Sequence, residues 1–257
     1  MKEDNQDSLK DIAEFISEYA SVLMGSGVHT SRIIRNTKRM AACLDVELKS
    51  SIFQKSIIFN VIDPRTKESY GTVTEFPSLP INFEYNAELS ALSWEAVDNH
   101  LSLSEVKAKY EAILAKPRMN KWLLLLLVGV ANGSFCRLFG GDWIATAVVF
   151  IATLVGFFVR TKLQGRGVNH YIVFIVSALV ASVCASSILW FGGNMDIALT
   201  TSVLFLIPGV PLINGIIDIV EGYTLTGIAR LTNAFLLIIC IAIGLSFTLW
   251  VVRDSLL

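Results

Sequence analysis

The second half of this 257-residue sequence contains very few charged side chains. Residues 1–121 include 15 basic and 17 acidic residues, whereas residues 122–257 include 6 and 5. An ordinary soluble domain has roughly 25% charged residues throughout, so one soluble globule is excluded, and so is a disordered chain. The pattern predicts an α-helical integral membrane protein, with a cytoplasmic α+β domain at residues 1–117 and a transmembrane domain at residues 118–257.

The sequence is also poor in the residues that build disulfide, metal and catalytic sites. Its four cysteines are scattered without a C-x-x-C pair, and its three histidines lie far apart. The N-terminal part has no phosphate-binding loop, catalytic triad or zinc motif. The formal net charge of −1 gives no indication of a strongly charged partner. We therefore expect no enzymatic activity, metal, cofactor or nucleic-acid partner.

Five apolar segments are long enough, or nearly so, to cross about 30 Å of hydrocarbon. They lie at about 122–139, 143–159, 168–191, 197–220 and 226–252. Arg160, Lys162 and Arg166 separate the second and third segments, and a further basic group precedes the first. Since short basic loops face the cytoplasm and no secretory signal is visible, we expect a cytoplasmic N-terminus and an external C-terminus.

The N-terminal part shows the patterns of a small mixed domain. Apolar spacing and turn residues predict helices and strands in turn. The expected helices lie at about 8–24, 30–44, 84–98 and 103–114, and the expected strands at about 53–62 and 69–76. Ser102 and Glu105 form a capping box at the start of the last of these helices.

The fourth apolar segment contains Pro208-Gly209-Val210-Pro211 near its middle. Two prolines remove two backbone donors, so the helix is expected to break at this point. Pro211 suits the first turn of a new half-helix. The free N–H groups from Leu212 onward would then form a positive end that can hold a carboxylate. A proline kink that only shapes helix packing is the structural alternative.

Polar side chains follow the break on one helical face. Asn214, Asp218 and Glu221 are spaced at i, i+4 and i+7. A carboxyl group inside a span is a candidate functional group, so Asp218 either carries a proton or forms a structural pair with Arg230. Arg230 either attracts an organic anion or extends to the headgroups, and Glu221 is expected to be an ordinary interfacial charge.

Two segments carry a family resemblance. Leu23-Met24-Gly25-Ser26-Gly27-Val28-His29-Thr30-Ser31-Arg32 resembles the start of the bacterial threonine/serine exporter family. The segment Pro208–Asn214, followed by Asp218, Gly222, Gly227 and Arg230, is similar to the membrane signature of that family. The order of a soluble region followed by five spans fits as well.

The resemblance implies a particular form of exporter. A full-length member has about ten spans in two differing halves, and this chain resembles the larger component of a split, two-gene form. The split form is associated with succinate export, and the fused form with threonine or serine export. The resemblance therefore implies a second small membrane subunit as partner, with homo-oligomerisation as the alternative.

The residues and the resemblance together predict an inner-membrane secondary exporter component. Its substrate would be a small carboxylate metabolite, either a threonine/serine-type amino acid or a dicarboxylate such as succinate. Asp218 would carry the coupling proton, and membrane lipid would be a partner of the transmembrane domain. The expected substrate-binding residues are Pro208, Gly209, Pro211, Leu212, Asn214 and Arg230. The alternative is a membrane-anchored sensor or regulatory protein whose soluble domain binds a ligand.

Overall fold

The computed structural model describes residues 8–53, 55–76, 79–117 and 119–252, which form two compact units. The first unit combines Met1–Pro117 with Val210–Leu231, and the second combines Arg118–Gly209 with Thr232–Leu257. One unit boundary thus falls at residue 117. Residues 210–231, which the sequence assigns to the membrane domain, group with the first unit.

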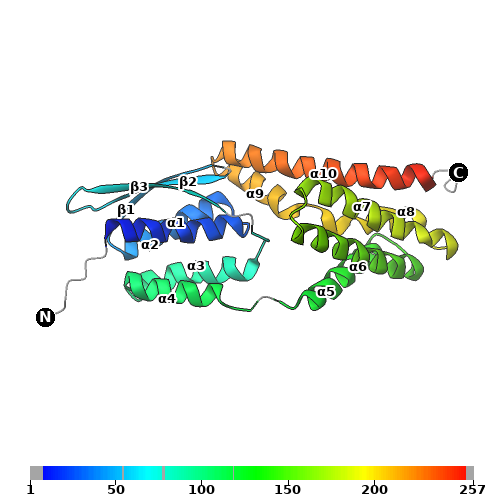
Figure 1. Ribbon diagram of the computed structural model, residues 1–257, viewed down its shortest axis with the longest axis horizontal. Helices are drawn as coiled ribbons and strands as arrows, with labels where there is room; N and C mark the ends of the chain where they lie inside the picture. Colours follow the sequence, from blue (N-terminus) through cyan, green and yellow to red (C-terminus); the bar gives the residue numbers. More distant parts are fainter. Residues whose placement is uncertain (1–7, 54, 77–78, 118, 253–257) are drawn as a thin grey trace. The chain divides into compact units, whose positions relative to one another are not determined.

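The N-terminal part of the first unit has three layers (Figure 1). Helices α1 (Leu9–Gly25) and α2 (Thr30–Cys43) form the middle layer. Helices α3 (Phe83–Asp98) and α4 (Leu103–Leu114) lie on one side of it, and the sheet lies on the other. The capping box of Ser102 and Glu105 is present at the start of α4. The four helices predicted for this part of the chain are confirmed to within a residue or two.

The sheet consists of three antiparallel strands in the order β1-β2-β3. Strand β2 (Ser56–Ile62) pairs with both β1 (Glu47–Ile52) and β3 (Ser69–Glu75). Its inward side chains are fully buried against the helices, and Phe59 lies at the centre of this face. The sequence Glu-Leu-Lys-Ser-Ser-Ile of β1 has little apolar alternation, so sequence patterning did not predict this strand.

The second unit is a bundle of apolar helices (Figure 1). Its elements are α5 (Lys121–Leu138), α6 (Trp143–Gly165), α7 (His170–Ser186), η1 (Ser187–Trp190), α8 (Met195–Ser202), η2 (Leu204–Leu206) and the later part of α10 (Thr224–Val252). Small residues allow close packing: a Cβ at Gly244 would lie 2.5 Å from the Ile175 carbonyl oxygen.

The structure has four or five candidate spans, where the sequence predicts about five. Within the described ranges, four helices are long and apolar enough to cross a membrane: α5, α6, α10, and α7 continued by η1. A fifth span results if Met195–Leu206 and Gly209–Val220 are counted as one bent pair. The chain is therefore mostly helical, with four or five candidate spans and a small N-terminal sheet.

Asn132 connects three elements of the second unit. Its buried amide donates to the Thr153 hydroxyl at 2.6 Å and to the Thr201 carbonyl at 3.1 Å. These bonds join α5 to α6 and α8. A hydrogen bond between helices in an apolar environment is worth about 0.6 kcal/mol on average.

We expect Asn132→Ala to lower the free energy of unfolding by about 1 kcal/mol, because both interhelical bonds are lost. The measurement is denaturation of the full chain in detergent micelles. Ser134→Ala is the matched control, because Ser134 is exposed and, among the residues that the structure describes, its hydroxyl bonds only to Val130 of its own helix. Equal stabilities for the two variants would contradict the proposed role of Asn132.

Candidate functional site

Residues 210–231 form a helical hairpin in the first unit. Helix α9 (Gly209–Val220) is joined to the start of α10 by a turn in which Gly222 has φ 90°. Gly215 and Gly227 bring the two backbones together, since a Cβ at Gly227 would lie 2.6 Å from the Gly215 carbonyl oxygen. Any larger side chain at Gly227 would therefore push the helices apart. This close contact between the two backbones sets the positions from which the polar side chains of the hairpin extend.

The carboxylate of Asp218 lies at the N-terminus of α2. Asp218 is 0% exposed, and it accepts hydrogen bonds from the Thr30 N–H at 2.8 Å and from the Thr30 hydroxyl at 3.0 Å. Its Oδ2 is 3.2 Å from Nε of Arg230. The residue before α2, His29, makes no capping hydrogen bond with its side chain. Asp218 therefore acts as the capping group of α2 from 188 residues away.

Asn214 and Arg230 bind the main chain of the segment that leads into α2. The Asn214 amide donates to the Gly27 carbonyl at 2.8 Å, and the Arg230 guanidinium donates to the Val28 carbonyl at 3.1 Å. Gly27 has φ 92°, a conformation that favours glycine. The structure thus brings together Asn214, Asp218 and Arg230, and the structural pair of Asp218 with Arg230 is present.

Glu221 lies at the same end of α2 and is more than an interfacial charge. It accepts a hydrogen bond from the Ser31 hydroxyl, and its carboxylate is 3.6 Å from Nδ1 of His29 and 3.8 Å from Arg35. Burial is the main reason why the pKa of His29 lies below its ordinary value, and Arg35 lowers it further against the opposing effect of Glu221. His29 is therefore neutral near pH 7.

The remaining predicted residues lie at the start of α9. Pro208 precedes the helix, Gly209 begins it, and Pro211 and Leu212 belong to its first turn. A new half-helix therefore starts where the sequence predicts one. A Cβ at Gly209 would meet no atom within 4 Å, so there is open space beside this residue.

Sequence reasoning did not identify the partners on the N-terminal side. Gly27 and Val28 contribute carbonyl oxygens, and Thr30 contributes its N–H as well as its hydroxyl. Any residue can offer a main-chain N–H or carbonyl group, so the sequence did not mark these three residues as partners of the polar cluster. The available signal was the segment 23–32, because it and the segment around Asp218 are the two that carry the family resemblance.

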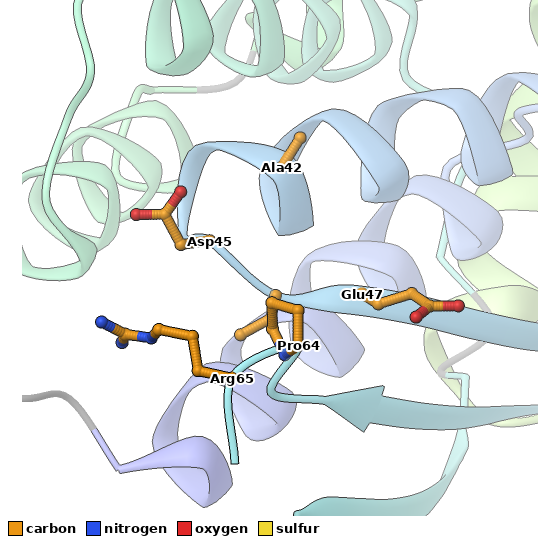
Figure 2. A pocket seen from close by; sticks show the side chains of 6 residues that line it. Ala42, Asp45, Glu47, Pro64 and Arg65 are labelled. Carbon is orange, nitrogen blue, oxygen red and sulfur yellow. The ribbon is translucent and has the colours of Figure 1, made fainter. Parts of the chain in front are cut away.

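A separate surface hollow lies between the end of α2 and the β2–β3 turn (Figure 2). Its lining residues are Ala42, Asp45, Val46, Glu47, Pro64 and Arg65. Figure 2 shows the side chains of Asp45 and Arg65 on one side, while the carboxyl group of Glu47 points to the other. The hollow is open, and its charged groups diverge. It therefore lacks the converging polar groups of a binding site.

We expect acidification from pH 7 to pH 5.5 to destabilise the protein through His29. The unfolded chain takes up a proton at the ordinary pKa of histidine, about 6.5, whereas the partly buried His29 resists protonation. The stability therefore decreases as the pH is lowered through this range. The measurement is the thermal midpoint against pH, and His29→Gln should show a smaller slope. His100→Asn is the control at an exposed histidine, and identical slopes for wild type and His29→Gln would contradict the assignment.

Comparisons with known proteins identify the family of this chain. A family model described as "Putative threonine/serine exporter" matches residues 14–252. The "Probable succinate transporter subunit YjjP" of Klebsiella aerogenes is 30% identical over 91% of this chain and 92% of its own length. The protein of the same name in Escherichia coli is 27% identical, over 90% and 91%.

A third relative is much longer than this chain. The "Probable threonine/serine exporter" of Mycobacterium tuberculosis is 21% identical over 90% of this chain but only 44% of its own length. No solved structure matches the chain. The family match spans both the N-terminal segment that contains Thr30 and the hairpin that contains Asp218. Its apolar helices indicate a multi-pass membrane protein, and the chain belongs to the threonine/serine exporter family.

Proposed function

We propose that this chain is the subunit of an inner-membrane secondary exporter that carries the soluble domain. Its substrate is a small carboxylate metabolite, either a threonine/serine-type amino acid or a dicarboxylate such as succinate. Family membership and the names of the relatives support this proposal. The observation that carries it is the fully buried Asp218 paired with Arg230, since ionisable groups among apolar helices are costly and usually serve function.

The substrate carboxylate binds, in this proposal, at the N-terminal end of α9. Pro208 interrupts the preceding helix and α9 begins at Gly209, so the N–H of Val210 in the first turn precedes the intrahelical hydrogen bonds, which begin at about Leu212. The open space beside Gly209 allows an anion to approach the main chain. Asn214 and Arg230 supply further polar contacts. This arrangement is the one expected of broken helices in secondary transporters.

Asp218 carries the coupling proton in the same proposal. Protonation removes the negative charge that now attracts both Arg230 and the N-terminus of α2. Arg230 then becomes available for the substrate carboxylate, while Asn214 and Arg230 can leave the carbonyls of Gly27 and Val28. Proton and substrate binding are therefore linked through one set of contacts. The N-terminal domain takes part in the transport cycle because it provides these contacts.

The functional unit includes a second, small membrane subunit. The word "subunit" in the names of the two bacterial relatives supports this assignment, and homo-oligomerisation is the alternative. We further propose that the N-terminus is cytoplasmic and that the C-terminus lies outside. The terminal residue Leu257 falls outside the described residues, and a reporter fused after it tests the orientation.

Efflux measurements test the proposed function directly. Cells or proteoliposomes loaded with labelled succinate or threonine should export one of them when this chain and its small partner are both present. Efflux should be absent when the partner is omitted. Absence of efflux for both compounds in the complete system would contradict the exporter proposal and favour the sensor alternative.

We expect Asp218→Asn to lower efflux by about tenfold or more, since losing even 1.4 kcal/mol of coupling energy has this effect, and to remove its dependence on the pH gradient. Asp196→Asn is the matched control, because Asp196 is an exposed carboxylate at the start of α8. Each variant is first checked for its thermal midpoint. An unchanged pH dependence in a folded Asp218→Asn protein would contradict the coupling role.

We expect Gly209→Ala to reduce efflux without loss of stability. The added methyl group fits the open space of the structure, but it would occupy room that a substrate needs, at a cost of about 1–3 kcal/mol. Gly165→Ala is the control, since a Cβ there also meets no atom within 4 Å. Wild-type efflux in Gly209→Ala would indicate that the helix break serves packing rather than binding.

A further inference from the structure

Arg160 occupies an unexpected position in the second unit. The sequence assigns it to the basic loop between the second and third spans, but α6 continues to Gly165 and includes it. The buried face of α6 includes Val149, Ala152 and Gly156 at helical spacing, and Arg160 follows Gly156 by four residues. Arg160 therefore extends the face of α6 that packs inside the bundle.

Two aromatic rings lie beside the guanidinium of Arg160. Its central carbon lies 5.0 Å from the ring centroid of Phe174 and 6.0 Å from that of Phe157. Phe157 in turn contacts Phe205 of η2, at a centroid distance of 6.3 Å. The faces of the rings interact with the positive charge of the guanidinium. They provide no hydrogen-bond acceptor for its N–H groups, which lie in the plane of the guanidinium.

Within the described part of the chain, one hydrogen-bond donor of Arg160 is buried without a partner. Its Nε is buried and has no hydrogen-bond acceptor, and no described carboxylate forms an ion pair with its guanidinium. In the first unit, by contrast, Arg230 has both a carboxylate and a carbonyl as partners. A guanidinium that is partly removed from water without an anion is strongly unfavourable.

The described carboxylates of the second unit lie at the opposite end of α6. Asp142 caps the N-terminus of α6 and accepts a hydrogen bond from the N–H of Asn194, just before the helix that contains Asp196. Arg160 is 18 residues beyond Asp142, which corresponds to about 27 Å along the helix. The residues near Arg160 on α6 and its C-cap are basic, namely Lys162 and Arg166.

We propose that Arg160 binds a carboxylate group of the transported anion. The planar guanidinium can donate two parallel hydrogen bonds to a carboxylate, and the rings of Phe174 and Phe157 lie beside it. A basic residue that only sets the orientation in the membrane would be exposed, as Lys162 and Arg166 are. The identity of the anion rests on the proposed function, whereas the anion site itself rests on the surroundings of Arg160.

The first measurement is thermal unfolding of the purified full chain, with its partner if one co-purifies. The probes are succinate, threonine and succinamide, in which amides replace both carboxylates. At ten times the dissociation constant, a bound carboxylate should raise the wild-type midpoint by about 3 to 6 °C. Succinamide should have no effect, and Arg160→Gln should abolish the shift.

Lys162→Gln and Arg166→Gln are the matched controls, because both lie near Arg160 but are exposed; they should keep the wild-type shift. Arg160→Lys keeps the charge but loses the two parallel donors, so its shift should be smaller than that of wild type. If Arg160→Gln does not give a monodisperse protein, the comparison of Arg160→Lys with wild type decides the question. An equal shift in Arg160→Lys and wild type would then overturn the proposal.

The second measurement is efflux of labelled succinate and threonine by the same variants. Transport by wild type and equally by folded Arg160→Gln would overturn the Arg160 site while leaving the exporter function intact. An Arg160-dependent midpoint shift without wild-type transport would support the site and contradict the function. A shift caused only by added phosphatidylglycerol would assign Arg160 to a lipid phosphate and overturn the proposal. The absence of any Arg160-dependent shift would overturn it whatever the transport result.

Discussion

The N-terminus of α2 depends on a carboxylate that comes from a distant part of the chain. Its first N–H group is bound by Asp218 of α9, and no side chain next to it in sequence takes this role. The favourable charge of a helix N-terminus and the positive charge of Arg230 together compensate the buried carboxylate. Because α2 packs between the sheet and α3, the hairpin of α9 and α10 is an integral part of the first unit.

The two arginines on apolar helices have contrasting surroundings. Arg230 is matched by a carboxylate and a carbonyl, so its charge is already neutralised in this state. Arg160 is held by aromatic rings and its Nε has no acceptor among the described residues. In the functions proposed above, the first is a pair that opens when a proton arrives, and the second is a cation that binds the transported anion.

The sequence predicted the positions of most helices and three members of the polar cluster. The charge-poor background made Asp218 and Arg230 conspicuous, and helical spacing placed Asn214 on the same face. It did not predict that these residues contact Gly27, Val28 and Thr30, because two carbonyls and an N–H have no sequence signature. Strand β1 was missed for a related reason: its polar sequence becomes a strand through pairing with β2.

The capping of α2 by Asp218 also bears on the order of events during synthesis. Thr30 leaves the ribosome 188 residues before its partner, and at 5–20 residues per second this delay is roughly 10 to 40 s. During that time the start of α2 is uncapped, and the surface that later contacts α9 is uncovered. The N-terminal part of the first unit is thus incomplete during translation, until the helices that follow it in the sequence have been synthesised as far as α9.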